Sequence, residues 1–553
     1  MGLAQRWLFV CVCSCCMPWT VFGCKDTPPQ HQRSEQGSPA VKQYGGVYRK
    51  PMRQEPQTLD PAFITSVFSA SIANQLFDGL VQFDADLNVM PSIAKSWAAS
   101  QDGLTWTFSL RDGVQFHHGR EVNAEDFVYT FTRLLDPKTA SPRAWLLERI
   151  QGAPEFRAGT AETVAGLRAL SRSTLQIVLS QPYAPFISVL GMVQVKVLPR
   201  EEVERLGAAF GRQPVGTGPF RFGHWLPGES MTLEANEAYY AGRPFLDRLH
   251  YRLLADNQSI LAAFVQGALE NVDLTGQEAT QLSNDVRFRF MRKPSLATVF
   301  LWLDTRQSAL GNRQVRQAIN YAINRNAISS GIQKNRHVQA RGILPLGMPG
   351  YDPDLVPYTY NVARARTLLA EAGYPAGKGL PPFELWTSTK SISVNQEHEA
   401  IKKDLEHVGI QVELHTAETW EQYASTILGK RPGAMYRYSW FADFPDPDNV
   451  LFPLFHSQSS DNYAHYSNPE VDRLLDEARS AGDYLKRIQL YRHIEALIMA
   501  DAPVVTLSYH TFENVFQPYV RGIELNGLGE RYIPMKKIWF DATRPVPHPT
   551  PRP

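Results

Sequence analysis

Cysteine is absent from almost the whole chain. The sequence has 553 residues and only five cysteines, the last of which is Cys24. Residues 25–553 therefore cannot form an internal disulfide, a thiolate metal site or a cysteine nucleophile. A chain of this length exceeds what one hydrophobic core holds, so we expect two or more lobes.

An excess of one charge is also missing. Lys and Arg together number 56 and Asp and Glu number 55, a formal net charge of +1. The first 23 residues contain Arg6 and no acidic residue, so residues 24–553 carry 55 charged side chains of each sign. A balanced chain gives no electrostatic basis for nucleic-acid binding, and we predict no nucleic-acid partner.

The usual signatures of catalysis are lacking as well. The sequence contains neither a G-x-S-x-G turn nor a Walker A loop. Lys402 stands four residues after His398, where a zinc protease has a second histidine, and Gly216–Pro219 is too short for a dinucleotide fingerprint. His117 and His118 leave a metal site or a solvated loop open, and we favour the loop because adjacent strand residues face opposite ways. We predict no catalytic residue, no metal and no cofactor.

The first 24 residues are typical of an export signal. Arg6 precedes an apolar stretch, residues 7–22, that is too short to span a membrane with ordinary flanks. Val21-Phe22-Gly23-Cys24 resembles a bacterial lipobox, which predicts removal of residues 1–23 and lipidation of Cys24. Attached acyl chains would anchor the protein to a membrane, at about 0.8 kcal/mol per buried CH₂. The alternative is a plain signal peptide with a chance cysteine.

Both ends of the remaining chain are rich in proline. Residues 24–43 are polar and nearly free of large apolar side chains, which predicts a lipidated cysteine followed by a disordered tether. Residues 543–553 predict a Pro-rich tail without a core-forming pattern.

Strand and helix patterns alternate between these ends. Apolar and polar residues alternate over 104–110, and the Asp112-Gly113 turn predicts a hairpin continuing to Phe116. Apolar residues at helical spacing predict helices at 312–323, 362–372 and 399–408 and a helical pair at 470–500. A strand is predicted at 410–414. Because helices and strands are interspersed, the fold class is α/β or mixed α+β.

The densest acidic cluster lies in the segment WFADFPDPDN, with Asp443, Asp446 and Asp448. Its prolines predict an extended, turn-rich loop. A solvated turn and a calcium loop are possible interpretations, although the glycine and distal glutamate of an EF-hand are missing. A carboxylate between Trp440 and Phe441 would also suit the ammonium group of a ligand.

Several segments together resemble the bacterial extracellular solute-binding proteins of family 5, whose best-known members bind oligopeptides and dipeptides. The resemblance extends from about residue 44 to residue 539. The most characteristic segment is SIAKSWAASQDGLTWTFSLRDGVQFHHGREVNAEDFVYTFTRLLDP, residues 92–137. The others are LDPAFITS (59–66), QLFDGL (75–80), PVGTGPF (214–220), NEAYYAGRPFLDRL (236–249), NRQVRQAINYAINR (312–325), AEAGYP (370–375) and SWFADFPDPDN (439–449).

This resemblance implies a two-lobed periplasmic binding protein fold of type II, with a hinge and a subdomain inserted in the first lobe. Ligand capture would couple to hinge-bending, which a permease can read. The implied boundaries are 44–86, 216–295 and 513–542 for lobe I, 87–215 for the inserted subdomain and 296–512 for lobe II.

The resemblance also implies ligand-binding residues in the acidic segment. In peptide-binding members, a Trp-x-x-Asp segment places its carboxylate against the ligand's α-ammonium group, and here it is matched by Trp440 and Asp443. Arg437 matches an arginine used toward the ligand carboxylate. The main chain around Ser439 and Phe441 would pair with the ligand backbone as an added strand.

A second segment is implied on the opposite side of the ligand. It comprises Thr65, Ser66 and Val67, which would form the facing strand. Arg143 departs from the family pattern, because peptide binders often have an aromatic residue at that place.

We therefore expect an exported, lipid-anchored bacterial protein that captures short peptides and delivers them to the permease of an ABC importer. It would face the periplasm or the cell exterior, and we predict a monomer. One alternative is a non-peptide solute, such as a nickel chelate, haem or a sugar. Another is a surface adhesin that retains the fold, and an enzyme is the interpretation that the sequence supports least.

Overall fold

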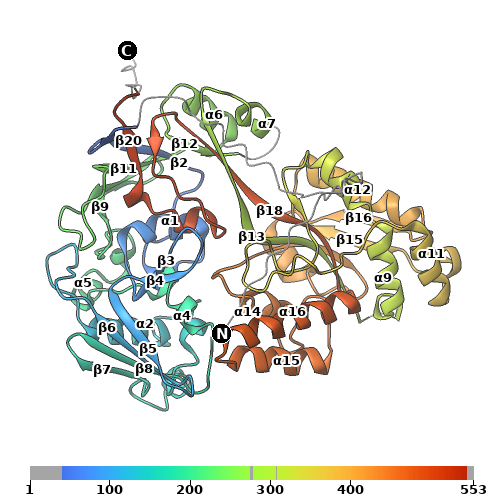
Figure 1. Ribbon diagram of the computed structural model, residues 1–553, viewed down its shortest axis with the longest axis horizontal. Helices are drawn as coiled ribbons and strands as arrows, with labels where there is room; N and C mark the ends of the chain where they lie inside the picture. Colours follow the sequence, from blue (N-terminus) through green and yellow to red (C-terminus); the bar gives the residue numbers. More distant parts are fainter. Residues whose placement is uncertain (1–39, 275–277, 307, 545–553) are drawn as a thin grey trace, which may run out of the picture. The chain divides into compact units, whose positions relative to one another are not determined.

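The computed structural model describes residues 40–274, 278–306 and 308–544, which combine α-helices with five β-sheets (Figure 1). The sequence predicts an α/β or mixed α+β fold class, and the interspersed helices and strands of the structure confirm it. The signal segment 1–23 and Cys24 lie outside the described residues. None of the described helices combines the length and apolar character needed to cross a membrane.

One four-stranded sheet has the order β2-β11-β10-β9. Its strands are β2 (Val47–Met52), β11 (Arg248–Leu253), β10 (Ser230–Ala235) and β9 (Phe220–Leu226). The sheet packs with helix α1 (Val67–Leu76) in one hydrophobic cluster that includes Leu76, Leu233 and Tyr251. This cluster also holds Phe516 and Phe540, so distant parts of the sequence close the same core.

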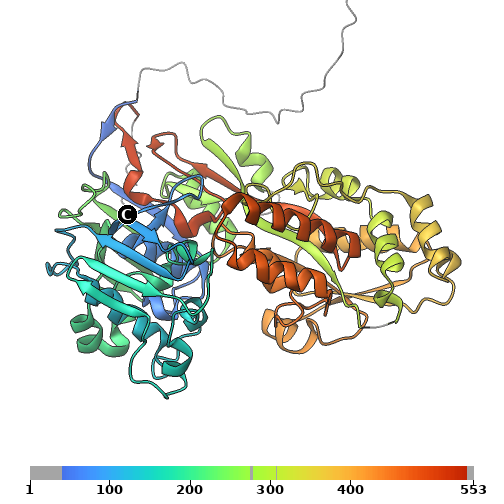
Figure 2. The same ribbon diagram turned by 60° about the horizontal axis from the view of Figure 1, so that its bottom comes forward.

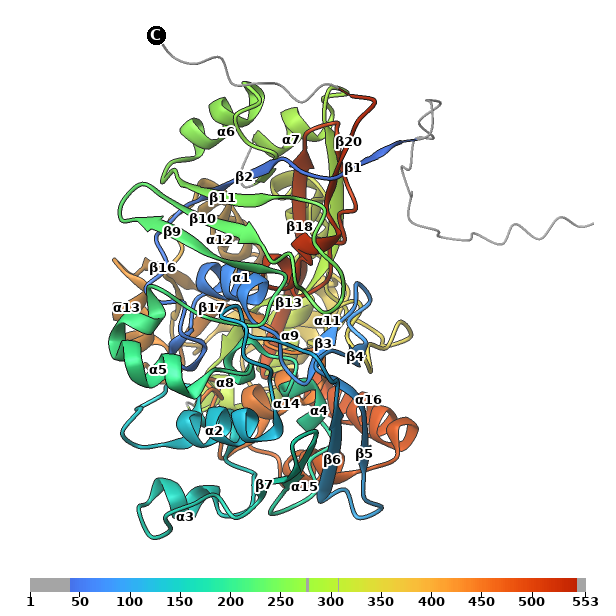
Figure 3. The same cartoon turned by 90° about the vertical axis from the view of Figure 1, so that its left-hand side faces the viewer.

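A second four-stranded sheet lies within residues 94–178 and has the order β5-β6-β8-β7. Figure 3 labels its strands β5, β6 and β7. Its strands are β5 (Ala94–Ala99), β6 (Thr105–Leu110), β8 (Thr174–Val178) and β7 (Leu167–Ser171). Helix α2 (Ala124–Leu135) buries Phe127 and Phe131 in the same core. Two short strands, β3 (Val81–Phe83) and β4 (Val89–Pro91), precede the sheet.

The predicted hairpin 104–116 is wrong in its second half. β6 forms as expected, but β5 occupies one of its edges and β8 the other. No edge is left for residues 114–116, which contribute Val114 and Phe116 to the core and form only the isolated bridge Gln115↔Glu121.

The structure has two long strands that pair antiparallel, β13 (Arg289–Leu303) and β18 (Val504–Phe516) (Figures 1 and 2). They form the centre of a seven-stranded sheet with the order β12-β18-β13-β17-β15-β16, and β14 pairs with β18. The other strands are β12 (Asn271–Asp273), β14 (Val338–Gln339), β15 (Phe383–Thr387), β16 (Val412–Thr416) and β17 (Met435–Phe441).

Both faces of this sheet are covered. Helices α9 (Arg313–Ala322), α11 (Val362–Glu371) and α12 (Ile392–Glu406) share one hydrophobic cluster with β13 and β15. Helices α14 (Asp448–Phe455), α15 (Pro469–Ser480) and α16 (Tyr484–Asp501) share another, and α15 and α16 lie side by side (Figure 2). The predicted helices 312–323 and 362–372 and the pair 470–500 are confirmed, and the third begins seven residues before the predicted 399.

The tether predicted for residues 24–43 ends earlier than expected. Lys42–Gln43 form strand β1, which pairs with β20 (Trp539–Asp541). Val41 N also donates to the Asp541 side chain at 3.3 Å. The first part of the tether and residues 545–553 of the Pro-rich tail lie outside the described residues.

Candidate functional site

Strand β17 carries the candidate site and has one open edge. On one side it pairs with β13 along its whole length, from Leu303↔Met435 to Ala297↔Phe441. On the other side β15 pairs only with Met435 and Tyr436. Beyond Tyr436, no strand in the part of the chain that the structure describes pairs with this edge.

The backbone of Ser439 and Phe441 points to that open edge. Ala442, directly after β17, donates its N–H to Leu296 O at 2.9 Å, and so points toward β13. Because backbone groups alternate in direction along a strand, the N–H and C=O groups of residues 439 and 441 point the other way. Arg437 agrees with this alternation, since its carbonyl accepts from the Tyr423 hydroxyl at 2.9 Å and not from β13.

The loop after β17 is fixed by the first turn of α14. Trp440 Nε1 donates to Asn449 O at 2.7 Å, and Asp443 N donates to Asn449 Oδ1 at 2.7 Å. Asn449 is buried, so both contacts are shielded from water. The Trp440 ring packs against the core shared by α14, α15 and α16. The Trp-x-x-Asp segment therefore has a defined geometry before any ligand is present.

The Asp443 carboxylate is partly paired. Arg531 Nη1 lies 3.1 Å from Asp443 Oδ1, and Arg531 Nη2 donates to Ala442 O at 2.6 Å. The side chains are 13% exposed for Arg531 and 26% for Asp443. Among the described residues, Asp443 Oδ2 has no hydrogen-bond donor. One carboxylate oxygen therefore remains available to a second cation.

Arg437 is paired more completely than Asp443. Its Nε lies 2.8 Å from Glu397 Oε1 on α12, and Gln333 Nε2 donates to Glu397 Oε2 at 3.0 Å. The side chains are 13% exposed for Arg437 and 3% for Glu397. A ligand carboxylate at Arg437 would have to share this guanidinium with a buried anion.

The other two acidic residues of the loop are structural. Asp446 pairs with Arg487, and burial raises the pKa of Asp446 although Arg487 opposes the shift. Asp448 Oδ1 lies 3.0 Å from Arg479, and Asp448 Oδ2 accepts from the Tyr183 hydroxyl at 3.0 Å. Both carboxylates are buried, unlike Asp443.

Thr65, Ser66 and Val67 do not form the facing strand that was expected. Ser66 is the N-cap of α1, and its hydroxyl accepts from Ser69 N at 3.1 Å. Thr65 and Val67 are exposed. Within the described ranges, none of the three is hydrogen-bonded or ion-paired to β17. The capping preference of serine outweighs strand formation here.

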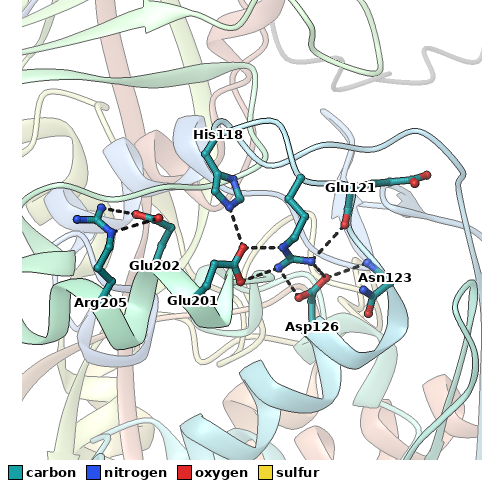
Figure 4. Close-up of polar contacts among 8 residues, drawn as sticks. His118, Glu121, Asn123, Asp126, Glu201, Glu202 and Arg205 are labelled. Carbon is teal, nitrogen blue, oxygen red and sulfur yellow. Dashed lines mark hydrogen bonds and ion pairs between the residues drawn. The ribbon is translucent and has the colours of Figure 1, made fainter.

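The histidine pair after β6 serves the fold, and Figure 4 shows His118 of this pair beside Glu201. Gly216 N donates to His117 Nδ1 at 3.1 Å, and burial lowers the pKa of His117 to about 4. His118 Nε2 lies 2.7 Å from Glu201 of α5 (Arg200–Leu206), which also pairs with Arg120. In the part of the chain that the structure describes, no group of three or more His, Cys, Asp or Glu residues is arranged to hold a metal ion.

Two partners of the site were missed by sequence reasoning. Arg531 is 88 residues from Asp443, and Glu397 is 40 residues from Arg437. Neither lies in a segment with a recognisable motif. Asn449 could have been identified from the sequence, because it is the last residue of the segment 439–449 that carries the family resemblance.

Strand β17 thus combines an open edge with an anchored, partly paired carboxylate just beyond its end. The family model of the bacterial extracellular solute-binding proteins, family 5, middle region, matches residues 88–462. The chain belongs to this family.

Two curated relatives from Escherichia coli K12 cover most of the chain. A dipeptide-binding protein is 27% identical over 502 residues, 86% of this chain and 92% of the relative. The glutathione-binding protein GsiB is 29% identical over 460 residues, 81% of this chain and 86% of the relative.

Solved structures agree with these relatives. The periplasmic binding protein DppA of Helicobacter pylori, in complex with the peptide STSA, matches with a TM-score of 0.74 and 28% identity, covering 90% of this chain and 99% of that one. HbpA2 of Haemophilus parasuis matches with a TM-score of 0.80 and 25% identity, covering 90% and 100%. The fold is the two-lobed periplasmic binding protein fold of this family.

Proposed function

We propose that this protein captures short peptides between its two lobes and delivers them to the permease of an ABC importer. The observation that carries the proposal is the open edge of β17 at Ser439 and Phe441, directly before the partly paired carboxylate of Asp443. A peptide backbone can extend the sheet at this edge, and its ammonium group can pair with Asp443 Oδ2. The dipeptide-binding relative and the peptide-bound DppA structure support this ligand class.

The roles of the remaining residues follow from their contacts. Trp440 would fix the loop and contribute its ring beside the ligand ammonium. Glu397 already compensates the charge of Arg437, so a ligand carboxylate at Arg437 would share the guanidinium with Glu397. Thr65, Ser66 and Val67 would contribute from the start of α1, as a loop and helix cap in place of a strand. We propose lobe boundaries at 295/296 and 512/513, within the long strands β13 and β18.

Native mass spectrometry of residues 25–553 tests the ligand class. The spectrum is recorded before and after addition of a pool of random tripeptides to pentapeptides. We expect adducts spread over many peptide masses, because backbone and ammonium recognition ignores most side chains. A single discrete adduct that peptides cannot displace would contradict the proposal and indicate a dedicated non-peptide solute.

We also propose that the protein is a monomer. A lipid on Cys24 would anchor it to a bacterial membrane, where it would face the periplasm or the cell exterior. The support is the lipobox-like segment 21–24. Cys24→Ser should shift the full chain from the detergent phase to the aqueous phase in a Triton X-114 partition. Cys16→Ser is the matched control and should leave the partition unchanged. A Cys24→Ser protein that stays in the detergent phase would refute the anchor.

A further inference from the structure

A polar pocket is lined by residues of α1, β3 and the segment 532–536, and none of its lining residues belongs to β17. Its empty volume is about 480 Å³, part of it open to solvent. The lining residues that carry the argument are Asp78, Gln82, Phe83, Lys196, Tyr532 and Lys536. We refer to this space as the Lys196 pocket.

Lys196 is the unusual residue of this pocket. It is only 4% exposed, and its ammonium group has no hydrogen bond or ion pair with any residue that the structure describes. Burial, with a smaller contribution from the charge of Lys536, lowers the pKa of Lys196 to about 8, while Asp78 opposes the shift. The group is therefore mostly protonated at pH 7. An unpaired buried cation is costly, so its environment must supply a partner.

The other charges of the pocket do not complete the pairing. Lys536 Nζ is a second cation, 3.1 Å from the Tyr239 hydroxyl and 3.5 Å from Gln82 Oε1. Asp78 is buried, and its Oδ2 has no hydrogen-bond partner in the described residues. With two ammonium groups and one carboxylate, the pocket keeps one uncompensated positive charge.

The walls of the pocket are closely fitted at two glycines. A Cβ atom at Gly79 would lie 3.1 Å from Lys196 Cδ. A Cβ atom at Gly191 would lie 2.5 Å from the Phe83 ring, which stacks edge-on against Tyr532 at 5.3 Å. Larger side chains at these positions would push Lys196 or Phe83 into the space. Close packing at Gly79 and Gly191 therefore holds Lys196 and Phe83 in place at the wall of the pocket.

We propose that the Lys196 pocket binds a small monovalent carboxylate, held between the ammonium groups of Lys196 and Lys536. One negative charge neutralises the excess charge of the pocket, and its two oxygens can accept from both lysines. The carboxylate could belong to a free ion or to the C-terminus of a captured peptide, and only the second source rests on the proposed function.

Thermal unfolding of residues 25–553 tests this site with sodium acetate as the probe, against sodium chloride at equal ionic strength. We expect a saturable rise in Tm with acetate at pH 7. In Lys196→Met the apparent acetate affinity should fall at least tenfold, and in the control Lys138→Met, an exposed lysine, it should be unchanged. Lys536→Met replaces Lys196→Met if that variant does not fold. The acetate effect should also weaken between pH 7 and pH 9, as Lys196 loses its proton.

A second arm compares trialanine with its C-terminal amide. If acetate has no effect but the free carboxylate of trialanine raises Tm more than the amide does, and Lys196→Met abolishes that difference, the carboxylate comes from the peptide. Failure of the peptide proposal alone would leave the acetate arm intact. The site is overturned if neither arm distinguishes Lys196→Met from the unmodified protein, since water then suffices as the partner of Lys196.

Discussion

Two ion pairs at β17, the strand proposed to pair with the ligand, differ in how completely their charged groups are paired and buried. Near the end of β17, Asp443 shares one oxygen with Arg531 and is 26% exposed. At the third residue of β17, Arg437 pairs with Glu397, which is 3% exposed and receives a further hydrogen bond from Gln333. Asp443 can therefore accept another cation at little cost, whereas freeing Arg437 would leave a buried anion uncompensated.

The difference separates a recognition group from a structural one. Asp443 and Arg437 were both predicted to contact the ligand. The contacts support that role for Asp443 and give Arg437 a role in joining β17 to α12. The ligand's ammonium group would then pair with the Asp443 side chain, and the ligand's backbone would hydrogen-bond to the open edge of β17.

The largest expected effect is on stability. Arg437→Met leaves Glu397 as an unpaired buried charge and should lower the free energy of unfolding by about 3–5 kcal/mol. Chemical denaturation at pH 7 measures this change. Arg473→Met, which breaks an exposed pair with Glu477, is the control and should cost less than about 1 kcal/mol.

The double variant Arg437→Met/Glu397→Gln should recover part of the lost stability, because it removes the orphaned charge. A single variant that unfolds like the unmodified protein would show that the Arg437–Glu397 pair is free to open. The comparison between the two ends of β17 would then fail.

Asp443→Asn should weaken peptide binding by about 2–5 kcal/mol, because it removes the charge that pairs with the ammonium group. Isothermal titration calorimetry with a tripeptide from the binding pool measures the change. Asp354→Asn, at an exposed position, is the matched control. Unchanged affinity in Asp443→Asn would assign Asp443 to the loop structure together with Asp446 and Asp448.

Glu495 is a further buried carboxylate that sharpens the comparison, because it lacks the cationic partner that Glu397 has. Glu495 accepts from Leu344 N at 2.8 Å but has no ion pair in the described residues, and burial raises the pKa of Glu495 to about 7. A raised folded-state pKa contributes stability below the ordinary value of 4.5, and that contribution is lost as the pH rises through 7. Glu495→Gln should therefore stabilise the protein by about 2–3 kcal/mol at pH 8 and by much less at pH 4.5. An advantage that does not change with pH would contradict the assigned protonation.

The smallest expected effect concerns Arg531. Its guanidinium lies beside the oxygen of Asp443 that it pairs with and repels a second cation there. Arg531→Met should tighten peptide binding roughly three- to tenfold, a change of about 0.6–1.4 kcal/mol. Titration against the same tripeptide measures it, with the exposed Arg473→Met as the arginine control. Weaker binding would mean that Arg531 positions Asp443 more than it competes with the ligand.

Local sequence patterns predicted much of the fold, because they depend on neighbouring residues. Asn312 caps α9 and Asn361 caps α11, as helix-start preferences require. The hairpin after β6 failed because β8, more than 60 residues further along the chain, occupies the edge that the turn at Asp112-Gly113 offered. Strand pairing between distant segments has no local signal.

The residues of the site that lie close together in the sequence were also predictable, whereas their partners from distant segments were not. Trp440 and Asp443 lie in one short segment, and Asn449 in that segment fixes both. The partners Arg531 and Glu397 come from other elements of the fold, and nothing near them in the sequence marks them. The prediction for Ser66 failed for a different reason. The family resemblance implied a strand there, although the local preference of a serine side chain is to cap a helix, as it does in α1.

The most direct test of the account is the affinity of the unmodified protein for one tripeptide and for its N-acetylated form. Acetylation removes the ammonium charge and leaves the backbone that pairs with β17. We predict that acetylation costs about 2–5 kcal/mol in the unmodified protein, which is about 30-fold or more, and less than about threefold in Asp443→Asn. Equal binding of the two peptides by the unmodified protein would contradict the central role of Asp443.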